Sequence, residues 1–188
     1  TDRCLVYDRP LPAGGLSWEE LVDWWARDAL HESTLDVAGR HLWRRLAQSL
    51  ASEPERMLFN AYTRRYGQDS ETPALLPQVW LHYDPFVRPR WTGRPGAVIR
   101  QRMDFLLLLP DRRPVVLEVD GRHHYASDDG RADPQRYATM VAEDRRLRLA
   151  GYEVYRFGGA EFLDTEASIE RMDTFFDELL NEPLRPHL

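Results

Sequence analysis

Apolar residues recur at helical spacing through the first fifty residues of the chain. The run Ser17-Trp18-Glu19-Glu20 has the pattern of a capping box, which predicts a helix beginning there. A second helix is predicted from about Ser33 to Leu50. A third begins at the capping box Ser52-Glu53-Pro54-Glu55 and ends near Gly67. The buried side of the second helix is expected to carry four leucines: Leu35, Leu42, Leu46 and Leu50.

The pattern changes after Gly67 to short apolar runs that are typical of strands. Pro134–Leu149 and Asp164–Leu180 return to a helical pattern, the latter with Ile169, Met172, Phe176 and Leu179 facing inward. From Ser52 onward the predicted order is helix, three strands, helix, strand, helix. The expected strands are Leu75–Tyr83, Val98–Leu109, Val115–Asp120 and Tyr152–Phe157.

These elements predict a mixed α/β fold with a central sheet of about four strands flanked by helices. We expect residues 1–51 to form a helical extension, and residues 52–188 to form the core with an acidic C-terminal helix. A chain of 188 residues is the length of one compact domain. The tryptophans of the extension, Trp18, Trp24, Trp25 and Trp43, are expected in the core or in a layer for dimerisation or docking within a larger protein.

The composition excludes some environments and leaves others open. The longest purely apolar run, Phe105–Leu109, is far shorter than the ~20 residues of a membrane helix, so we expect a cytoplasmic protein without a membrane partner. The single cysteine, Cys4, has no internal disulfide partner. The net charge is -6, yet the segment 88–102 carries five arginines and no acid, so nucleic acid stays open as a partner.

Three carboxylates stand in or beside the predicted strands. Asp104 precedes the run Phe105–Leu109, while Glu118 and Asp120 share one face because residues two apart on a strand point the same way. A short turn between the strands predicts an antiparallel hairpin that brings Asp104 near Asp120, depending on register. Clustered carboxylates raise the pKa of at least one member unless a hard cation binds among them, and Mg²⁺ prefers such oxygen ligands.

This arrangement resembles the PD-(D/E)XK nuclease superfamily, whose core order of helix, three strands, helix and strand matches residues 52 to about 165. The sequence Glu-Val-Asp-Gly followed by histidine is similar to the branch near very-short-patch repair endonucleases. The runs at 137–145 and 151–158 are similar to nuclease domains of bacterial abortive-infection proteins.

The resemblance implies roles for individual residues. Asp104 and Glu118 match the metal-binding positions, with Mg²⁺ or Mn²⁺ as the cofactor and Asp120 beside them. Glu55 matches a helix glutamate that contacts the metal through water. Asp120 stands where the family has lysine, and this chain contains no lysine at all. Positive charge then comes from Arg102 or Arg122, and a proton acceptor from His123 or His124, of which we favour His124.

The implied activity is metal-dependent hydrolysis of phosphodiester bonds by an endonuclease, with DNA favoured over RNA, in antiphage defence or restriction. Phosphate contacts are expected from Arg100, Arg102, Arg122 and Arg145, and Gln101 is a further candidate for orienting water or substrate. The alternatives are a catalytically inactive module that binds nucleic acid or a protein partner, and a hydrolase of small phosphoesters.

Several of these residues also have ordinary structural explanations. Glu55 fits the capping box of its helix, and Asp104 fits an ion pair with Arg100 or Arg102. Asp120-Gly121 fits a turn, and Asp144-Arg145 fits a surface ion pair.

Overall fold

The computed structural model describes residues 5–31, 34–67, 69–80, 102–121 and 133–181 of the chain. These residues form a mixed α/β fold around one four-stranded sheet, as the sequence predicts. The helices are α1 (Trp18–Trp24), α2 (Leu35–Ala47), α3 (Glu53–Tyr66), α4 (Pro134–Leu149) and α5 (Thr165–Asn181), with a π-helical turn at Trp25–Leu30 and 3₁₀ turns at Pro110–Arg112 and Gly159–Phe162. The strands are β1 (Leu76–Trp80), β2 (Arg102–Leu109), β3 (Arg113–Asp120) and β4 (Glu153–Gly158).

The four strands lie in the order β1-β2-β3-β4. The pairs β1–β2 and β2–β3 are antiparallel, whereas β3–β4 is parallel and is connected through α4. The order α3, β1, β2, β3, α4, β4 is therefore the order expected for residues 52 to about 165. The β2–β3 connection is a short turn, as predicted, in which Asp111 adopts a positive φ of 59°; β3 begins at Arg113, two residues before the expected Val115.

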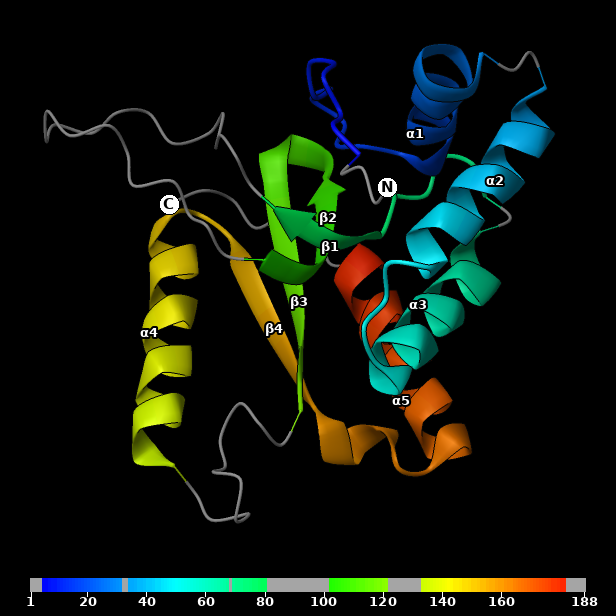
Figure 1. The fold of residues 1–188 in the computed structure, drawn as a ribbon. Coiled ribbons are helices and arrows are strands. Elements are labelled where there is room, and N and C mark those ends of the chain that lie inside the picture. Colours follow the sequence, from blue (N-terminus) through cyan, green and yellow to red (C-terminus); the bar gives the residue numbers. More distant parts are fainter. Residues whose placement is uncertain (1–4, 32–33, 68, 81–101, 122–132, 182–188) are drawn as a thin grey trace, which may run out of the picture.

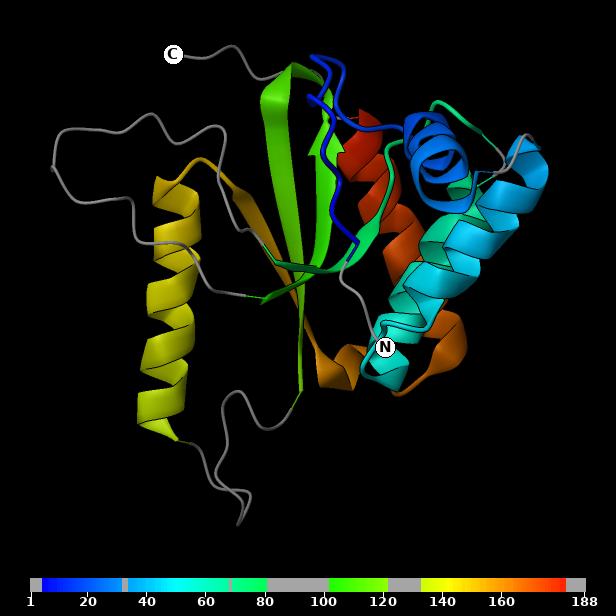
Figure 2. The same cartoon turned by 45° about the horizontal axis from the view of Figure 1, so that its top comes forward.

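The sheet separates two hydrophobic clusters. Helix α4 lies alone on one side of the sheet, and helices α1, α2, α3 and α5 lie together on the other (Figures 1 and 2). The smaller cluster contains Val116, Leu147 and Val154, so Leu147 attaches α4 to the sheet. The larger cluster contains Leu42 of α2 and Phe176 of α5 together with strand residues such as Phe105 and Leu117. The helical extension and the core consequently share one hydrophobic core.

The helix starts follow from the residues that cap them. The side chain of Ser17 accepts a hydrogen bond from the Glu20 N–H, and Glu20 returns the bond to the Ser17 backbone, which completes the predicted capping box of α1. Asp133 caps α4 by accepting from the N–H groups of Gln135 and Arg136. These local bonds fix where the helices begin without help from the rest of the fold.

Some sequence expectations differ from the structure in detail. Leu35 is 47% exposed, because it is the first residue of α2 and lies outside the buried stripe of Leu42 and Leu46. On α5, Ser168 is fully buried while Ile169 is only half-buried, so the buried stripe is rotated by one residue at that end. The expected strand portions at 81–83 and 98–101 lie outside the described residues.

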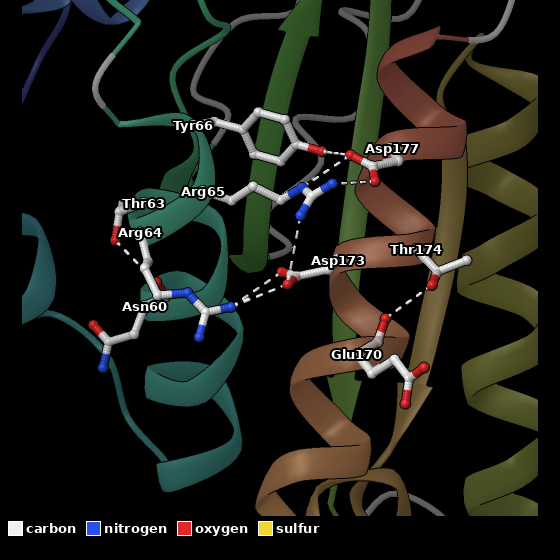
Figure 3. A network of polar contacts seen from close by, with 9 residues as sticks. All are labelled: Asn60, Thr63, Arg64, Arg65, Tyr66, Glu170, Asp173, Thr174 and Asp177. Carbon is white, nitrogen blue, oxygen red and sulfur yellow. Dashed lines mark hydrogen bonds and ion pairs between the residues drawn. The ribbon is translucent and has the colours of Figure 1, made fainter.

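The acidic helix α5 is held to α3 by ion pairs. Arg64 pairs with Asp173 at 3.1 Å, and Arg65 pairs with both Asp173 and Asp177 (Figure 3). The Tyr66 hydroxyl also donates to Asp177, and burial followed by that carboxylate raises the pKa of Tyr66 to about 12. Part of the acidic charge of α5 therefore serves to attach this helix. Among the described residues, no helix combines the length and the apolar character needed to cross a membrane.

Candidate active site at the end of the central hairpin

The β2–β3 hairpin brings Asp104 and Glu118 together. Phe105 pairs with Leu117, and the same register continued by one residue places Asp104 opposite Glu118. The Asp104 Oδ2 accepts a hydrogen bond from the backbone N–H of Val119 at 2.9 Å, which fixes the carboxylate beside β3. The sequence left the register open and named Asp120 as the neighbour of Asp104. The observed register instead makes Glu118 that neighbour.

Glu118 is a buried carboxylate with an unsatisfied oxygen. Glu118 is 6% exposed, and its Oε1 has no hydrogen-bond partner among the residues that the structure describes. Burial is the largest cause that raises the pKa of Glu118 to about 8; the charges of Asp104, Asp120 and Glu143 also act to raise this pKa, and Arg156 acts to lower it. A buried acceptor oxygen without a donor is unfavourable, so a proton or a bound cation at this position would stabilise the fold.

Asp120 lies two residues further along β3 and is 8% exposed. Its Oδ1 accepts from the Arg156 Nη1 at 2.8 Å in an ion pair whose two side chains are 11% and 20% exposed. The sequence predicts Asp120 as a metal ligand, and that role stays a prediction. The structure shows that one of its oxygens already contacts a guanidinium.

Arg156 is a site residue that the sequence analysis missed. It pairs with Glu118 in the parallel ladder of β3 and β4. Its Nε donates to Asp144 Oδ1 on α4 at 3.2 Å, and Asp144 also pairs with Arg148 at 3.1 Å. The alternative that Asp144 forms a surface pair with Arg145 is therefore wrong. The available signal was a charged residue between Tyr155 and Phe157, in the middle of a predicted core strand.

Glu55 lies at the start of α3 and is 5% exposed. Its Oε1 accepts from the Ser52 hydroxyl at 2.9 Å, and its Oε2 accepts from the Ala51 N–H at 2.9 Å. The Ser52 hydroxyl in turn accepts from the Glu55 N–H, so the helix-cap explanation of Glu55 is confirmed. A direct role for Glu55 in catalysis stays a prediction, because both of its oxygens are already used.

Gln78 of β1 is a second residue that the sequence analysis missed. Its Nε2 donates to Glu55 Oε2 at 2.7 Å, and its own Oε1 is buried with no hydrogen-bond partner in the described part of the chain. Its φ of 55° is unusual for a residue other than glycine, and such conformations are frequent at functional sites. The β1–β2 register places Gln78 opposite Asp104. No sequence signal marks this residue, because its conformation depends on contacts between distant segments.

The other predicted residues divide into two groups. Arg102 and Arg145 are exposed and form no ion pair with any residue that the structure describes, so both side chains are free to meet a phosphate. The remaining candidates lie outside the described residues: Arg100, Gln101, Arg122, His123 and His124.

The donor set fits a divalent cation held by two carboxylates. Within the described ranges, no three histidine, cysteine or acidic side chains are placed to share a metal ion. Mg²⁺ nevertheless binds through one or two carboxylates, with water and phosphate oxygens completing its shell. Asp104 with the unsatisfied Glu118 Oε1 supplies that minimum.

The chain was compared with known proteins. No family model, no curated protein and no solved structure matches it.

Proposed function

We propose that this protein is a metal-dependent nuclease that hydrolyses phosphodiester bonds in nucleic acid, with DNA as the favoured substrate. The observation that carries the proposal is the buried Glu118 carboxylate, which has an unpartnered oxygen beside Asp104 at the end of the central hairpin. A buried carboxylate beside a second carboxylate is unfavourable unless a proton or a cation compensates it. The order of elements around them is also the order of the nuclease superfamily that the sequence resembles.

Asp104 and Glu118 would hold the cation, either Mg²⁺ or Mn²⁺. When bound, such an ion polarises the scissile phosphate and lowers the pKa of an attacking water. The part of Asp104 is to keep its carboxylate fixed through the Val119 N–H. Glu118 contributes an oxygen that makes no competing hydrogen bond to any described residue.

Exposed arginines would bind the substrate backbone. Arg102 begins β2 two residues before Asp104, and Arg145 lies on α4, the helix whose Asp144 contacts Arg156 beside Glu118. Guanidinium groups contact phosphates without reading bases, so we expect little sequence specificity from these contacts. As in the families that the chain resembles, we propose a role in bacterial antiphage defence or restriction in the cytoplasm.

The second candidate is a catalytically inactive module of the same fold that binds nucleic acid or a protein partner. The observation that favours it is the ion pair between Asp120 and Arg156, because this pair engages one of the three carboxylates of the motif. The two candidates differ in whether the folded protein cleaves nucleic acid.

The decisive experiment is a cleavage assay on plasmid, linear duplex DNA, single-stranded DNA and RNA with Mg²⁺, Mn²⁺ or EDTA. Wild type is compared with Asp104→Asn, Glu118→Gln and the control Glu170→Gln, which changes an exposed acid on α5. We expect metal-dependent cleavage that falls at least 100-fold in the first two variants and is unchanged in the control. Cleavage retained in both site variants would refute this active site, and no cleavage by wild type would favour the inactive module.

A further inference from the structure

Arg156 places a positive charge beside Glu118 of the candidate site. The chain has no lysine, and the described strands carry three arginines: Arg102, Arg113 and Arg156. Arg113 pairs with Glu153 at the far end of the sheet, and Arg102 is exposed at the start of β2. Arg156 alone among these three stands next to Glu118 in the ladder, and its contact with Asp144 of α4 places it on the face that α4 covers.

Two carboxylates hold the Arg156 guanidinium in one orientation. Asp120 Oδ1 accepts from Nη1 at 2.8 Å, and Asp144 Oδ1 accepts from Nε at 3.2 Å. The side chain is 20% exposed, so water screens these contacts only partly. A guanidinium stays protonated at every physiological pH, so this positive charge is permanent.

Asp120 is correspondingly turned toward Arg156. The backbone at this point is packed closely, since a Cβ at Gly159 would lie 3.2 Å from the Asp120 carbonyl oxygen. Gly158 also pairs with Asp120 in the ladder, so β3 and β4 stay paired up to the carboxylate. The strand pairing and the ion pair together fix Asp120 beside β4. Glu118, in contrast, keeps an oxygen without a partner.

We propose that Asp120 anchors Arg156 and is not a ligand of the cation, and that Arg156 is the positioning residue that holds a fixed positive charge beside Glu118. This inference rests on the proposed nuclease function. It leaves Asp104 and Glu118 as the only carboxylates on the cation from the described strands. The coordination positions that Asp120 would have filled stay open for water and for a substrate phosphate.

The test is Mn²⁺ binding by isothermal titration calorimetry on the full chain, without nucleic acid. We expect Asp104→Asn and Glu118→Gln to weaken binding at least tenfold, and Asp120→Asn to change it less than threefold. Arg156→Gln should strengthen binding about threefold, because it removes a positive charge and releases Asp120. Circular dichroism confirms that each variant is folded. An Asp120→Asn loss as large as that of Glu118→Gln would overturn the inference.

Cleavage provides an independent measurement with a matched control. Arg156→Gln should lower kcat about 100-fold with KM within threefold, whereas Arg156→Lys keeps the charge and should stay within tenfold of wild type. The control Arg148→Gln removes the other arginine that pairs with Asp144. The Arg148 side chain is 62% exposed, and the kcat of this variant should stay within threefold of wild type. Equal losses in Arg148→Gln and Arg156→Gln would show that the network has only a structural role.

The two proposals fail in different ways. A wild-type protein that binds Mn²⁺ but cleaves no substrate would refute the nuclease proposal, while the binding series would still decide the role of Asp120. A protein that cleaves, but whose Asp120→Asn variant no longer binds Mn²⁺, would refute only the inference about Asp120 and Arg156.

Discussion

Glu118 and Arg156 lie side by side in register on the parallel strands β3 and β4, yet the Arg156 guanidinium bonds to Asp120 and Asp144. Within the described ranges, one Glu118 oxygen consequently has no hydrogen-bond partner. The charges of Asp120 and Asp144 compensate Arg156, whereas Asp104 and Glu118 repel each other. This unequal distribution is the physical basis for the predictions about the site.

The first prediction concerns the stability of the metal-free protein. Burial, with Asp104 next in effect, raises the pKa of Glu118 from 4.5 to about 8, so the folded state keeps a proton that the unfolded state releases. The stabilising contribution of this proton is therefore complete below about pH 4.5 and is lost as the pH rises through 8. We expect Glu118→Gln to exceed wild type in free energy of unfolding by about 1–4 kcal/mol at pH 8.

Urea denaturation in EDTA at pH 5, 6.5 and 8 measures this difference. The control is Glu170→Gln, because Glu170 is exposed and its change should leave the pH dependence as in wild type. Equal stabilities of wild type and Glu118→Gln at all three pH values would show that Glu118 is ionised without penalty.

The second prediction concerns cation binding as a function of pH. A carboxylate ligand must lose its proton before it binds a metal ion, so the affinity for Mg²⁺ should rise about tenfold per pH unit up to about pH 8. The stabilisation of the fold by 10 mM Mg²⁺ should accordingly be larger at pH 8 than at pH 6, because a ligand that binds only the folded state stabilises it more when its affinity is higher. Thermal unfolding with and without Mg²⁺ at the two pH values measures it.

Glu118→Gln is the comparison for this experiment, since an amide neither titrates nor binds Mg²⁺ strongly. A stabilisation by Mg²⁺ that persists in Glu118→Gln would place the cation somewhere else on the protein.

The third prediction separates two roles of Glu55. Its oxygens accept from Ala51, Ser52 and Gln78, and the last of these bonds holds a residue whose φ is 55°. We expect Glu55→Gln to lower the free energy of unfolding by about 1–2 kcal/mol, because an amide replaces one acceptor oxygen by a donor. Cleavage should stay within tenfold of wild type when assayed well below the unfolding temperature.

The matched control is Glu53→Gln on the same helix turn, where the side chain is 71% exposed and contacts Arg56. It should change the stability by less than about 0.5 kcal/mol. A 100-fold loss of cleavage in folded Glu55→Gln would instead support the metal-contacting role that the family resemblance implies.

Much of the fold was predictable because its signals are local. The caps at Ser17 and Ser52 mark helix starts within four residues, and Pro134 begins α4 as predicted. The apolar runs before Leu109 and after Val115 identify the central hairpin. A short turn makes those two strands antiparallel neighbours, and this pairing does not depend on contacts with distant parts of the chain.

The site was less predictable because it depends on contacts between distant segments. The neighbour of Asp104 depends on the register of the hairpin, and a shift of one residue would exchange the faces of the strand. Arg156 forms ion pairs with Asp144 on α4 and Asp120 on β3, and Gln78 donates a hydrogen bond to Glu55 on α3. None of these pairs follows from spacing along the sequence. The carboxylate motif was therefore visible in the sequence, whereas the residues that support it were not.

The last prediction tests how the helical extension is attached to the sheet. Gly15 has a φ of +90°, and a Cβ there would lie 2.2 Å from the Leu108 carbonyl oxygen, which accepts the Leu16 N–H at 2.9 Å. Gly14 has no atom within 4 Å of its Cβ position. We expect Gly15→Ala to lower the free energy of unfolding by at least about 2 kcal/mol and Gly14→Ala by less than about 0.5 kcal/mol.

Urea denaturation followed by tryptophan fluorescence measures both variants. The tryptophans buried in α1 and the adjoining π-helical turn, Trp24 and Trp25, report on the extension. Equal effects of the two substitutions would show that the segment before α1 contributes little to holding the extension against β2.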